Sequence, residues 1–216
     1  MTADTSITQT VVDSFNNSRE QTNPGRHFLF DTCLPPDVVD QVLDMPIKPA
    51  DITSTEGKRS TNNDSRVHFG IDNRGQYPVM DKIAEAYQSP EVVEAIERNT
   101  GADLADSLLR IELCQDSDGF WLEPHIDIGV KRLSMMIYLN RDDDTLGTDL
   151  YTADHQLHPA APAPLNSGLL FIAQDQVVHG FEKREIKGVR KALMVNYVGP
   201  EWRNTHELCY PDKPVR

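Results

Sequence analysis

Short stretches of alternating apolar and polar residues fill the second half of the chain. From about Leu108 onward they are separated by turn-forming segments such as DSDG and DDDTLG. Strands of this length, bounded by Gly, Asp and Pro, are typical of a β-barrel or sandwich. The stretches are LLRIELCQ, GFWLEPHID, RLSMMIYLN, TDLYT, GLLFIA and RKALMVNYV.

The first half of the chain has a helical pattern instead. Apolar residues recur at helical spacing in PPDVVDQVLDM, YPVMDKIAEAYQ and SPEVVEAIERNTG, while RHFLFDTCL alternates like a strand. In the last helix Ser89 is placed to cap the start and Gly101 to end it. Helices first and strands later predict a mostly β domain with flanking helices, with helical support over about 26–105 and a β core over about 106–200.

Two polar segments lie outside this pattern. Residues 1–25 are polar and predict a disordered lead-in, which leaves 26–216 as a single domain. Residues 51–76 are rich in Ser, Thr, Asn, Asp and Gly, and are too long for a simple connection in a compact domain. This second segment is either a binding loop that closes over a ligand or an ordinary surface loop.

Composition narrows the class of protein. Of 216 residues, 38% are hydrophobic and 25% charged, and the formal net charge is −13. Because such a surface repels phosphates and anionic lipids, we expect no nucleic acid and no membrane as partner. Cys33, Cys114 and Cys209 form no CxxC pair, and the N-terminus lacks the apolar core of a signal peptide. These features predict a cytoplasmic protein; its oligomeric state is not readable from the sequence.

The segment EPHIDIG carries the first candidate chemistry. On a strand, residues two apart point the same way, so His125 and Asp127 would project into one space as two metal ligands. His179, before a glycine and after the strand GLLFIA, is the preferred third ligand; His155 and His158, in a Pro- and Ala-rich loop, are weaker rivals. Two histidines and one carboxylate leave coordination positions open, which suits Fe(II) binding a cosubstrate and O2.

With these residues in order, the sequence resembles the Fe(II)/2-oxoglutarate-dependent oxygenases, and within them the prolyl 4-hydroxylase-like branch. The resemblance spans Leu108 to Val198, about half of the chain, and implies a double-stranded β-helix, a jelly-roll fold of the cupin type. It implies Fe(II) held by His125, Asp127 and His179, with 2-oxoglutarate and O2 as cosubstrates and ascorbate as a stimulant. The matching motifs are His125-x-Asp127, YLN, GTDL in the place of GG-x-L, GLLFI, His179-Gly180 and Gly188-x-Arg190.

The resemblance also assigns the cosubstrate's far carboxylate. Arg190, eleven residues after His179, matches the basic anchor of the family, and Tyr138 matches a tyrosine that donates to the same carboxylate. A guanidinium offers a permanently charged, two-pronged partner for such a group.

The substrate contacts are expectations of a different kind. Gln115 and Asn196 stand where related hydroxylases carry aromatic residues, Trp121 leads into the histidine motif, and Arg66 lies in the polar loop. A polar pocket predicts hydroxylation of an sp³ carbon in a small polar molecule, with release of succinate and CO2. Two alternatives stay open: a peptidyl proline as substrate, and a cupin-like metal-binding protein that uses no 2-oxoglutarate.

Overall fold

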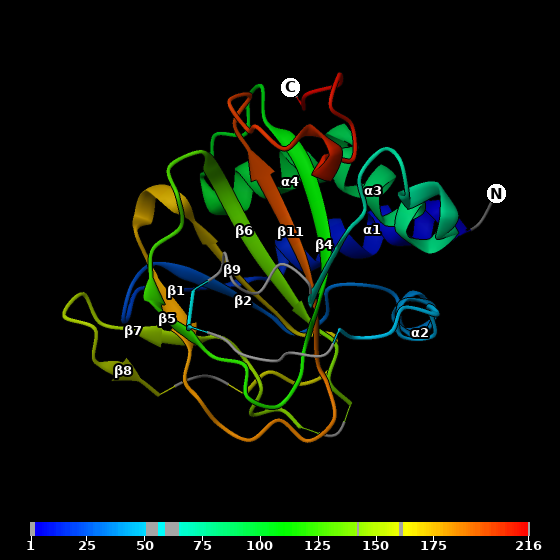
Figure 1. The fold of residues 1–216 in the computed structure, drawn as a ribbon. Helices are drawn as coiled ribbons and strands as arrows, with labels where there is room; N and C mark the ends of the chain where they lie inside the picture. The colour runs from blue at the N-terminus through cyan, green and yellow to red at the C-terminus, as the bar shows by residue number, and fades with distance from the viewer. Residues whose placement is uncertain (1–2, 51–55, 59–64, 142, 160–161, 216) are drawn as a thin grey trace.

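Two antiparallel sheets and a group of helices make up the fold in a computed structural model, which describes residues 3–50, 56–58, 65–141, 143–159 and 162–215 (Figure 1). The larger sheet has seven strands in the order β1-β2-β9-β6-β11-β4-β3. The smaller has four, in the order β5-β10-β7-β8. The prediction of a mostly β protein with flanking helices is confirmed at this level.

The bounds of the elements follow the predicted pattern closely in the second half of the chain. The larger sheet consists of β1 (Arg19–Gln21), β2 (His27–Phe30), β3 (Arg66–His68), β4 (Leu108–Asp116), β6 (Lys131–Tyr138), β9 (Gly168–Ile172) and β11 (Arg190–Val198). The smaller sheet consists of β5 (Leu122–His125), β7 (Asp149–Tyr151), β8 (Leu157–His158) and β10 (Val178–Phe181). The helices are α1 (Ala3–Asn16), α2 (Pro36–Leu43), α3 (Pro78–Gln88) and α4 (Pro90–Thr100), with 3-10 turns η3 (Arg74–Gln76), η4 (Ala173–Asp175) and η5 (Thr205–Glu207).

The ends of α4 are set by the residues that the sequence indicated. The Ser89 side chain accepts a hydrogen bond from Val92 N, and Pro90 occupies the first turn. Gly101 has a φ of 72°, in the left-handed region, where a residue without Cβ ends a helix at least cost.

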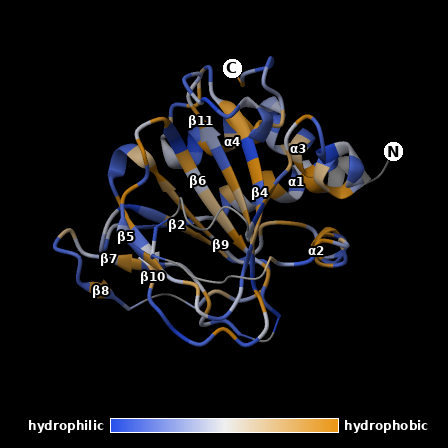
Figure 2. Cartoon of the chain, in the orientation of Figure 1, coloured by the Kyte–Doolittle hydropathy of each residue, from blue (hydrophilic) through white to orange (hydrophobic). Residues whose placement is uncertain are grey.

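Helices cover one face of the larger sheet, and the main hydrophobic core lies between the helices and that face. In β4 the odd-numbered residues Leu109, Ile111 and Leu113 belong to this core together with residues of α1, α3 and α4. The even-numbered side chains therefore point to the opposite face, because side chains alternate along a strand. Figure 2 shows apolar and polar segments alternating along β4. That opposite face is the one turned toward the smaller sheet and the candidate site.

The first 25 residues correct one prediction. They include helix α1, whose Ile7, Val11 and Phe15 are each 1% exposed, and strand β1, which pairs with β2. Phe15 packs edge-on against Phe30, with ring centroids 5.1 Å apart. The segment is polar overall, but Ile7, Val11 and Phe15 lie on one face of the helix, and that face packs into the core.

The 51–76 segment is described only in part. The predicted loop falls largely on residues 51–55 and 59–64, which lie outside the described residues. Its far end contains the short edge strand β3 and the turn η3 rather than unbroken loop. Among the described residues no helix is long and apolar enough to cross a membrane.

Candidate metal centre

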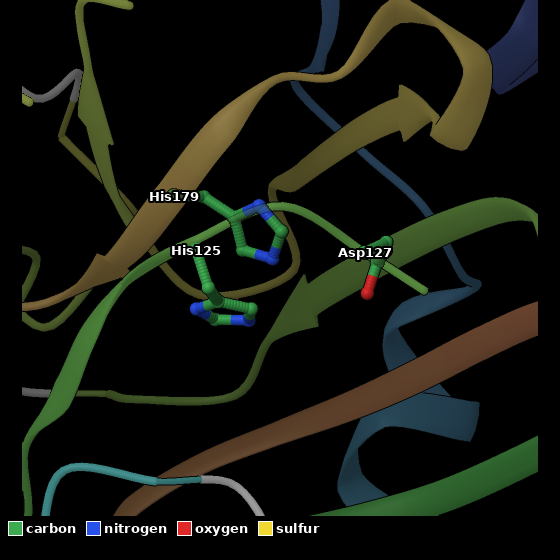
Figure 3. A group of neighbouring side chains, drawn as sticks. All are labelled: His125, Asp127 and His179. Carbon is green, nitrogen blue, oxygen red and sulfur yellow. The ribbon is translucent and has the colours of Figure 1, made fainter. Parts of the chain in front are cut away.

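The two histidines of the predicted site face each other across a pair of strands. β5 and β10 run antiparallel, with His125 directly opposite His179. Asp127 follows β5 by two residues. In the described part of the chain these three residues form the one group with metal-ligand chemistry: one ligand atom of each lies within 4.8 Å of the other two (Figure 3).

Backbone carbonyls fix which nitrogen of each imidazole can bind a metal. Nδ1 of His125 lies 2.8 Å from the carbonyl oxygen of Glu123, and Nδ1 of His179 lies 2.9 Å from that of Val177. A carbonyl only accepts, so each Nδ1 carries the hydrogen and each Nε2 keeps its lone pair. Two imidazole nitrogens and one carboxylate on one side of a site are the ligand set of non-haem Fe(II). The residues present therefore fit this metal.

Asp127 is held in its ionised form. Lys131 Nζ donates to its Oδ1 at 2.6 Å and the Ser134 hydroxyl to its Oδ2 at 2.6 Å. Burial raises the pKa of Asp127, but Lys131, His179 and the hydrogen bond from Ser134 outweigh it and bring the pKa to about 2. Asp127 is thus a negatively charged candidate ligand at neutral pH.

His179 is held neutral by its surroundings. Burial against Phe171, whose ring centroid is 4.2 Å away, lowers the pKa of His179 to about 4, although Asp127 acts in the opposite direction. A neutral imidazole is the form that a metal needs.

The buried side-chain amide of Asn196 supports Asp127 through Ser134. Ser134 Oγ also lies 2.9 Å from Asn196 Oδ1, across the β6–β11 pair. A hydroxyl has one hydrogen, so when it donates to Asp127 the Asn196 amide must turn its Nδ2 toward the serine. Nδ2 has no hydrogen-bond partner among the described residues as drawn, which agrees with this rotation.

The rival histidines lie elsewhere. His158, in β8, interacts with Asn23, and His155 is exposed in a turn with a φ of 64°. Neither belongs to the group of three.

A cavity of about 290 Å³ opens in front of the candidate ligands. Ile126 and Ile128, which flank Asp127, are 46% and 58% exposed at its edge. Its lining includes the buried Arg66 and Arg190 and the polar residues Arg110, Glu112, Asn204 and Glu207, together with Trp202. The cavity therefore has the candidate metal ligands and strongly charged side chains in its lining.

Arg190 is buried and already has two partners. Its Nε donates to the carbonyl of Leu146 at 2.8 Å and its Nη1 to Asp116 Oδ2 at 2.6 Å. The guanidinium carbon lies 4.5 Å from the centre of the Phe181 ring. Arg190 thus faces the same cavity as the candidate ligands.

Tyr138 lies on a different wall. Its hydroxyl accepts a hydrogen bond from Thr148 N at 3.1 Å and remains free to donate one. Burial raises the pKa of Tyr138, which keeps the phenol protonated. The residue lines a second cavity of about 360 Å³, which shares Thr148 with the first. Thr148 thus lies between Tyr138, in the second cavity, and the cavity that Arg190 lines.

Of the four predicted substrate contacts, only Arg66 lines the cavity. The prediction for Gln115 was wrong: it shares the helix-facing side of β4 with Leu113. Trp121 does not line this cavity; its indole packs under Gly57, where an added Cβ would come within 2.3 Å of the ring, and its predicted substrate contact stays a prediction. Asn196 contacts Ser134, so it acts on Asp127 rather than on a ligand.

Sequence reasoning missed the roles of several polar and charged residues that line the cavity or bond its lining residues. Lys131 and Ser134 hold Asp127, and Asp116 bonds Arg190. Arg110 binds Glu112 through Nη2 at 2.8 Å and Glu207 through Nε at 2.6 Å. A signal was present: three of the five even-numbered residues of β4 are charged, whereas three of the four odd-numbered ones are aliphatic.

Comparison with solved structures identifies the fold. A prolyl hydroxylase from Trichoplax adhaerens, in complex with a hypoxia-inducible-factor peptide, superposes with a TM-score of 0.59 at 14% identity over 88% of each chain. A prolyl-4-hydroxylase from Pseudomonas putida gives 0.55 at 16% identity, over 89% of this chain and 99% of that one. The non-heme α-ketoglutarate-dependent epimerase SnoN of nogalamycin biosynthesis gives 0.52 at 11% identity, over 89% and 83%.

The class that these neighbours define is that of the 2-oxoglutarate–Fe(II) oxygenases. The chain has the fold of that class and resembles its prolyl hydroxylase branch. No family model matches the sequence, and no curated protein matches it either.

Proposed function

We propose that this chain is an Fe(II)- and 2-oxoglutarate-dependent dioxygenase that hydroxylates an sp³ carbon of a small polar molecule, with release of succinate and CO2. One observation carries the proposal: a His–Asp–His group and a buried arginine face the same cavity. A protein that only stored a metal would have no use for a buried cation within reach of it. We further propose that the two sheets form a double-stranded β-helix around this cavity.

In this proposal each residue has a defined task. His125 and His179 present neutral Nε2 donors, and Asp127 adds the single negative charge. Lys131, Ser134 and Asn196 hold the carboxylate in place. Fe(II), together with 2-oxoglutarate and O2, supplies the oxidising power for insertion of oxygen into a C–H bond.

The cosubstrate and the substrate are proposed to occupy different walls. Arg190 binds the far carboxylate of 2-oxoglutarate, and Tyr138 is proposed to donate to the same group. The cavity's limited volume and its charged wall of Arg110, Glu112 and Glu207 support a small polar substrate. The apolar side chains of Phe171, Phe181 and Met136 keep water away from the reacting atoms.

A metal and turnover assay tests the reaction class. Asp127→Ala and His179→Ala should lose both bound Fe(II) and succinate release, because each removes one of three ligands. His155→Ala is the matched control and should keep both. Full iron occupancy with undiminished succinate release in Asp127→Ala would remove the carboxylate from the site. Ascorbate is added in a parallel arm, where we expect stimulation.

A peptidyl-proline hydroxylase is the second candidate function. It is favoured by the fold likeness to prolyl hydroxylases, one of them bound to a peptide. Succinate release with Fe(II) and 2-oxoglutarate, measured over a library of small molecules and over proline-containing peptides, separates the candidates. Stimulation by peptides alone would replace the small-molecule proposal.

A further inference from the structure

One buried carboxylate is shared by two arginines that line the cavity. Asp116, at the end of β4, is 0% exposed. Its Oδ1 accepts from Arg66 Nη1 at 2.5 Å and its Oδ2 from Arg190 Nη1 at 2.6 Å. The arginines come from β3 and β11, so side chains from three strands of the larger sheet meet at this point.

The charges in this cluster do not balance. Two guanidiniums share a single carboxylate, and the side chains of Arg66 and Arg190 are only 4% and 5% exposed. The next carboxylates, Glu112 and Glu207, both contact Arg110, at 2.8 and 2.6 Å, and Glu112 also acts electrostatically on Arg66. The group of Arg66, Arg190 and Asp116 by itself carries one net positive charge, so it is suited to receive one anion from the cavity.

Hydrogen-bond donors are available for that anion. Among the described residues, Nη2 of Arg66 and Nη2 of Arg190 make no hydrogen bond, and both residues line the cavity of the candidate ligands. The two guanidinium carbons lie 5.6 and 6.0 Å from the centre of the same Phe120 ring. Nε of Arg66 is buried and has no partner among the described residues. The donors of both arginines therefore border one space.

Arg190 by itself does not give this space a positive charge. Asp116 neutralises one guanidinium, so an Arg190–Asp116 pair would present no net charge to an arriving carboxylate. Arg66 supplies the second positive charge and makes the cluster attractive to an anion.

We propose that Arg66 binds the far carboxylate of 2-oxoglutarate together with Arg190, and that Asp116 is a positioning residue that sets the spacing of the two guanidiniums. This inference rests on the proposed function, in which Arg190 was the only cation with that role. The ligand is a carboxylate. Its second guanidinium partner, Arg66, comes from the edge strand β3.

Direct binding of 2-oxoglutarate tests the role of Arg66. Calorimetric titration of the full chain, loaded with Mn²⁺ to prevent turnover, gives the dissociation constant. Arg66→Gln should weaken 2-oxoglutarate binding roughly ten- to a hundredfold, the effect of one charge-assisted hydrogen bond. Arg66→Lys, which keeps the charge but not the fork, should fall between Arg66→Gln and the wild type.

A double variant distinguishes an effect of the charge of Arg66 from a purely structural effect of its side chain. Arg66→Gln combined with Asp116→Asn removes one positive and one negative charge, which restores the original net charge with Arg190 as the only cation. We expect this double variant to bind 2-oxoglutarate more tightly than Arg66→Gln. If the double variant binds 2-oxoglutarate more weakly than Arg66→Gln, the charge argument is wrong.

Two further variants locate the cause of any failure. Arg74→Gln is the matched control, since Arg74 pairs with Asp81 outside the cavity, and its 2-oxoglutarate affinity should equal that of the wild type. If Arg190→Gln weakens 2-oxoglutarate binding but folded Arg66→Gln and Arg66→Lys do not, this inference fails and the proposed function stands. If Arg190→Gln has no effect either, the proposed cosubstrate itself is wrong.

Discussion

Single hydrogen bonds decide what the candidate ligands can do. Each imidazole gives its Nδ1 hydrogen to a carbonyl two residues earlier in the chain, which directs Nε2 toward the shared space. Asp127 is fixed through two further side chains, Lys131 and Ser134. The geometry of the three ligands thus depends on atoms that would never touch the metal.

Asn196→Leu tests this dependence. The substitution removes the amide that supports Ser134, and affinity for Mn²⁺ should fall about 10- to 100-fold, as for the loss of other outer supports of metal ligands. Ser134→Ala should cause a similar loss, and the double variant should be no worse than either, because both act through Asp127. Asn17→Ala, on the exposed end beyond α1, is the control. Additive losses in titrations of the three variants would contradict the proposed relay.

Sequence patterns predicted part of this site for physical reasons. His125 and Asp127 followed from the two-residue period of a strand, and His179 from its place between a buried strand and a glycine, whereas Arg190 came from the resemblance to the oxygenase family. Lys131, Ser134 and Asp116 could not be found in this way, because their roles depend on partners from other strands. Those pairings, such as Ser134 with Asn196, exist only once the register of β6 and β11 is known.

At the scale of elements, the β5–β10 pair brings the histidines together. Gly180, next to His179, lies where an added Cβ would approach the carbonyl oxygen of Leu122 to 2.7 Å and that of Glu123 to 3.1 Å. The glycine therefore permits the two strands to come close. Since Glu123 O is also the acceptor for His125 Nδ1, the same contact affects both histidines.

Gly180→Ala should push β10 away from β5 and weaken binding of Mn²⁺, with at least a tenfold higher dissociation constant expected from a displacement of these backbone-anchored ligands. Gly75→Ala is the matched control, because an added Cβ there meets nothing within 4 Å. Metal titration and circular dichroism of both variants check the result. Unchanged affinity in a folded Gly180→Ala would show that the strands can separate without loss of the site.

At the level of elements, the sequence did not reveal which face of β4 points to the cavity. The sequence of β4 gives two faces, and the mistaken choice of Gln115 came from assigning it to the cavity face. The aliphatic residues at odd positions pack under the helices, and the even-numbered Arg110 and Glu112 line the cavity. Short edge strands such as β3 were missed because three residues carry too little periodicity.

In the whole molecule, a larger sheet that is packed against helices faces a smaller sheet that contributes none of its described residues to that main core. Helices α1, α3 and α4 gather on one side of the larger sheet in Figure 1. Through α1, the beginning of the chain contributes to the same core as β4 and β11. Its predicted disorder was wrong because the amphipathic stripe is narrow and its apolar residues are few.

Phe15→Ala measures how much α1 contributes to stability. Removing a fully buried aromatic ring should lower the free energy of unfolding by about 3–5 kcal/mol. Gln9→Ala, on the exposed side of the same helix, should change it by no more than about 0.5 kcal/mol. Urea unfolding followed by circular dichroism gives both values. Equal stability of the two variants would mean that α1 docks without contributing to folding.

Stability of the metal-free protein should depend on pH through His179. Its folded pKa of about 4 lies below the ordinary value of 6.5, so the unfolded chain binds a proton between these values that the folded chain does not. The free energy of unfolding therefore falls as the pH drops through this window, by about 2 kcal/mol between pH 7 and 5. Urea unfolding with a chelator present should show a shallower pH dependence in His179→Gln; identical dependence would exclude His179 as its origin.

The division between the two sheets has a consequence for how a metal ion could enter and leave. The largest hydrophobic cluster of described residues takes no member from β5, β7, β8 or β10, the strands of the sheet that carries both histidines. The apolar residues of the smaller sheet, such as Leu150 and Phe181, belong to two smaller clusters instead. Regions outside the main core open at a smaller free-energy cost than the whole molecule. Exchange of the ion can then proceed through local opening of the smaller sheet while the larger sheet and its helices stay folded. The lifetime of the loaded state would be governed by this local fluctuation, independently of the stability of the molecule as a whole.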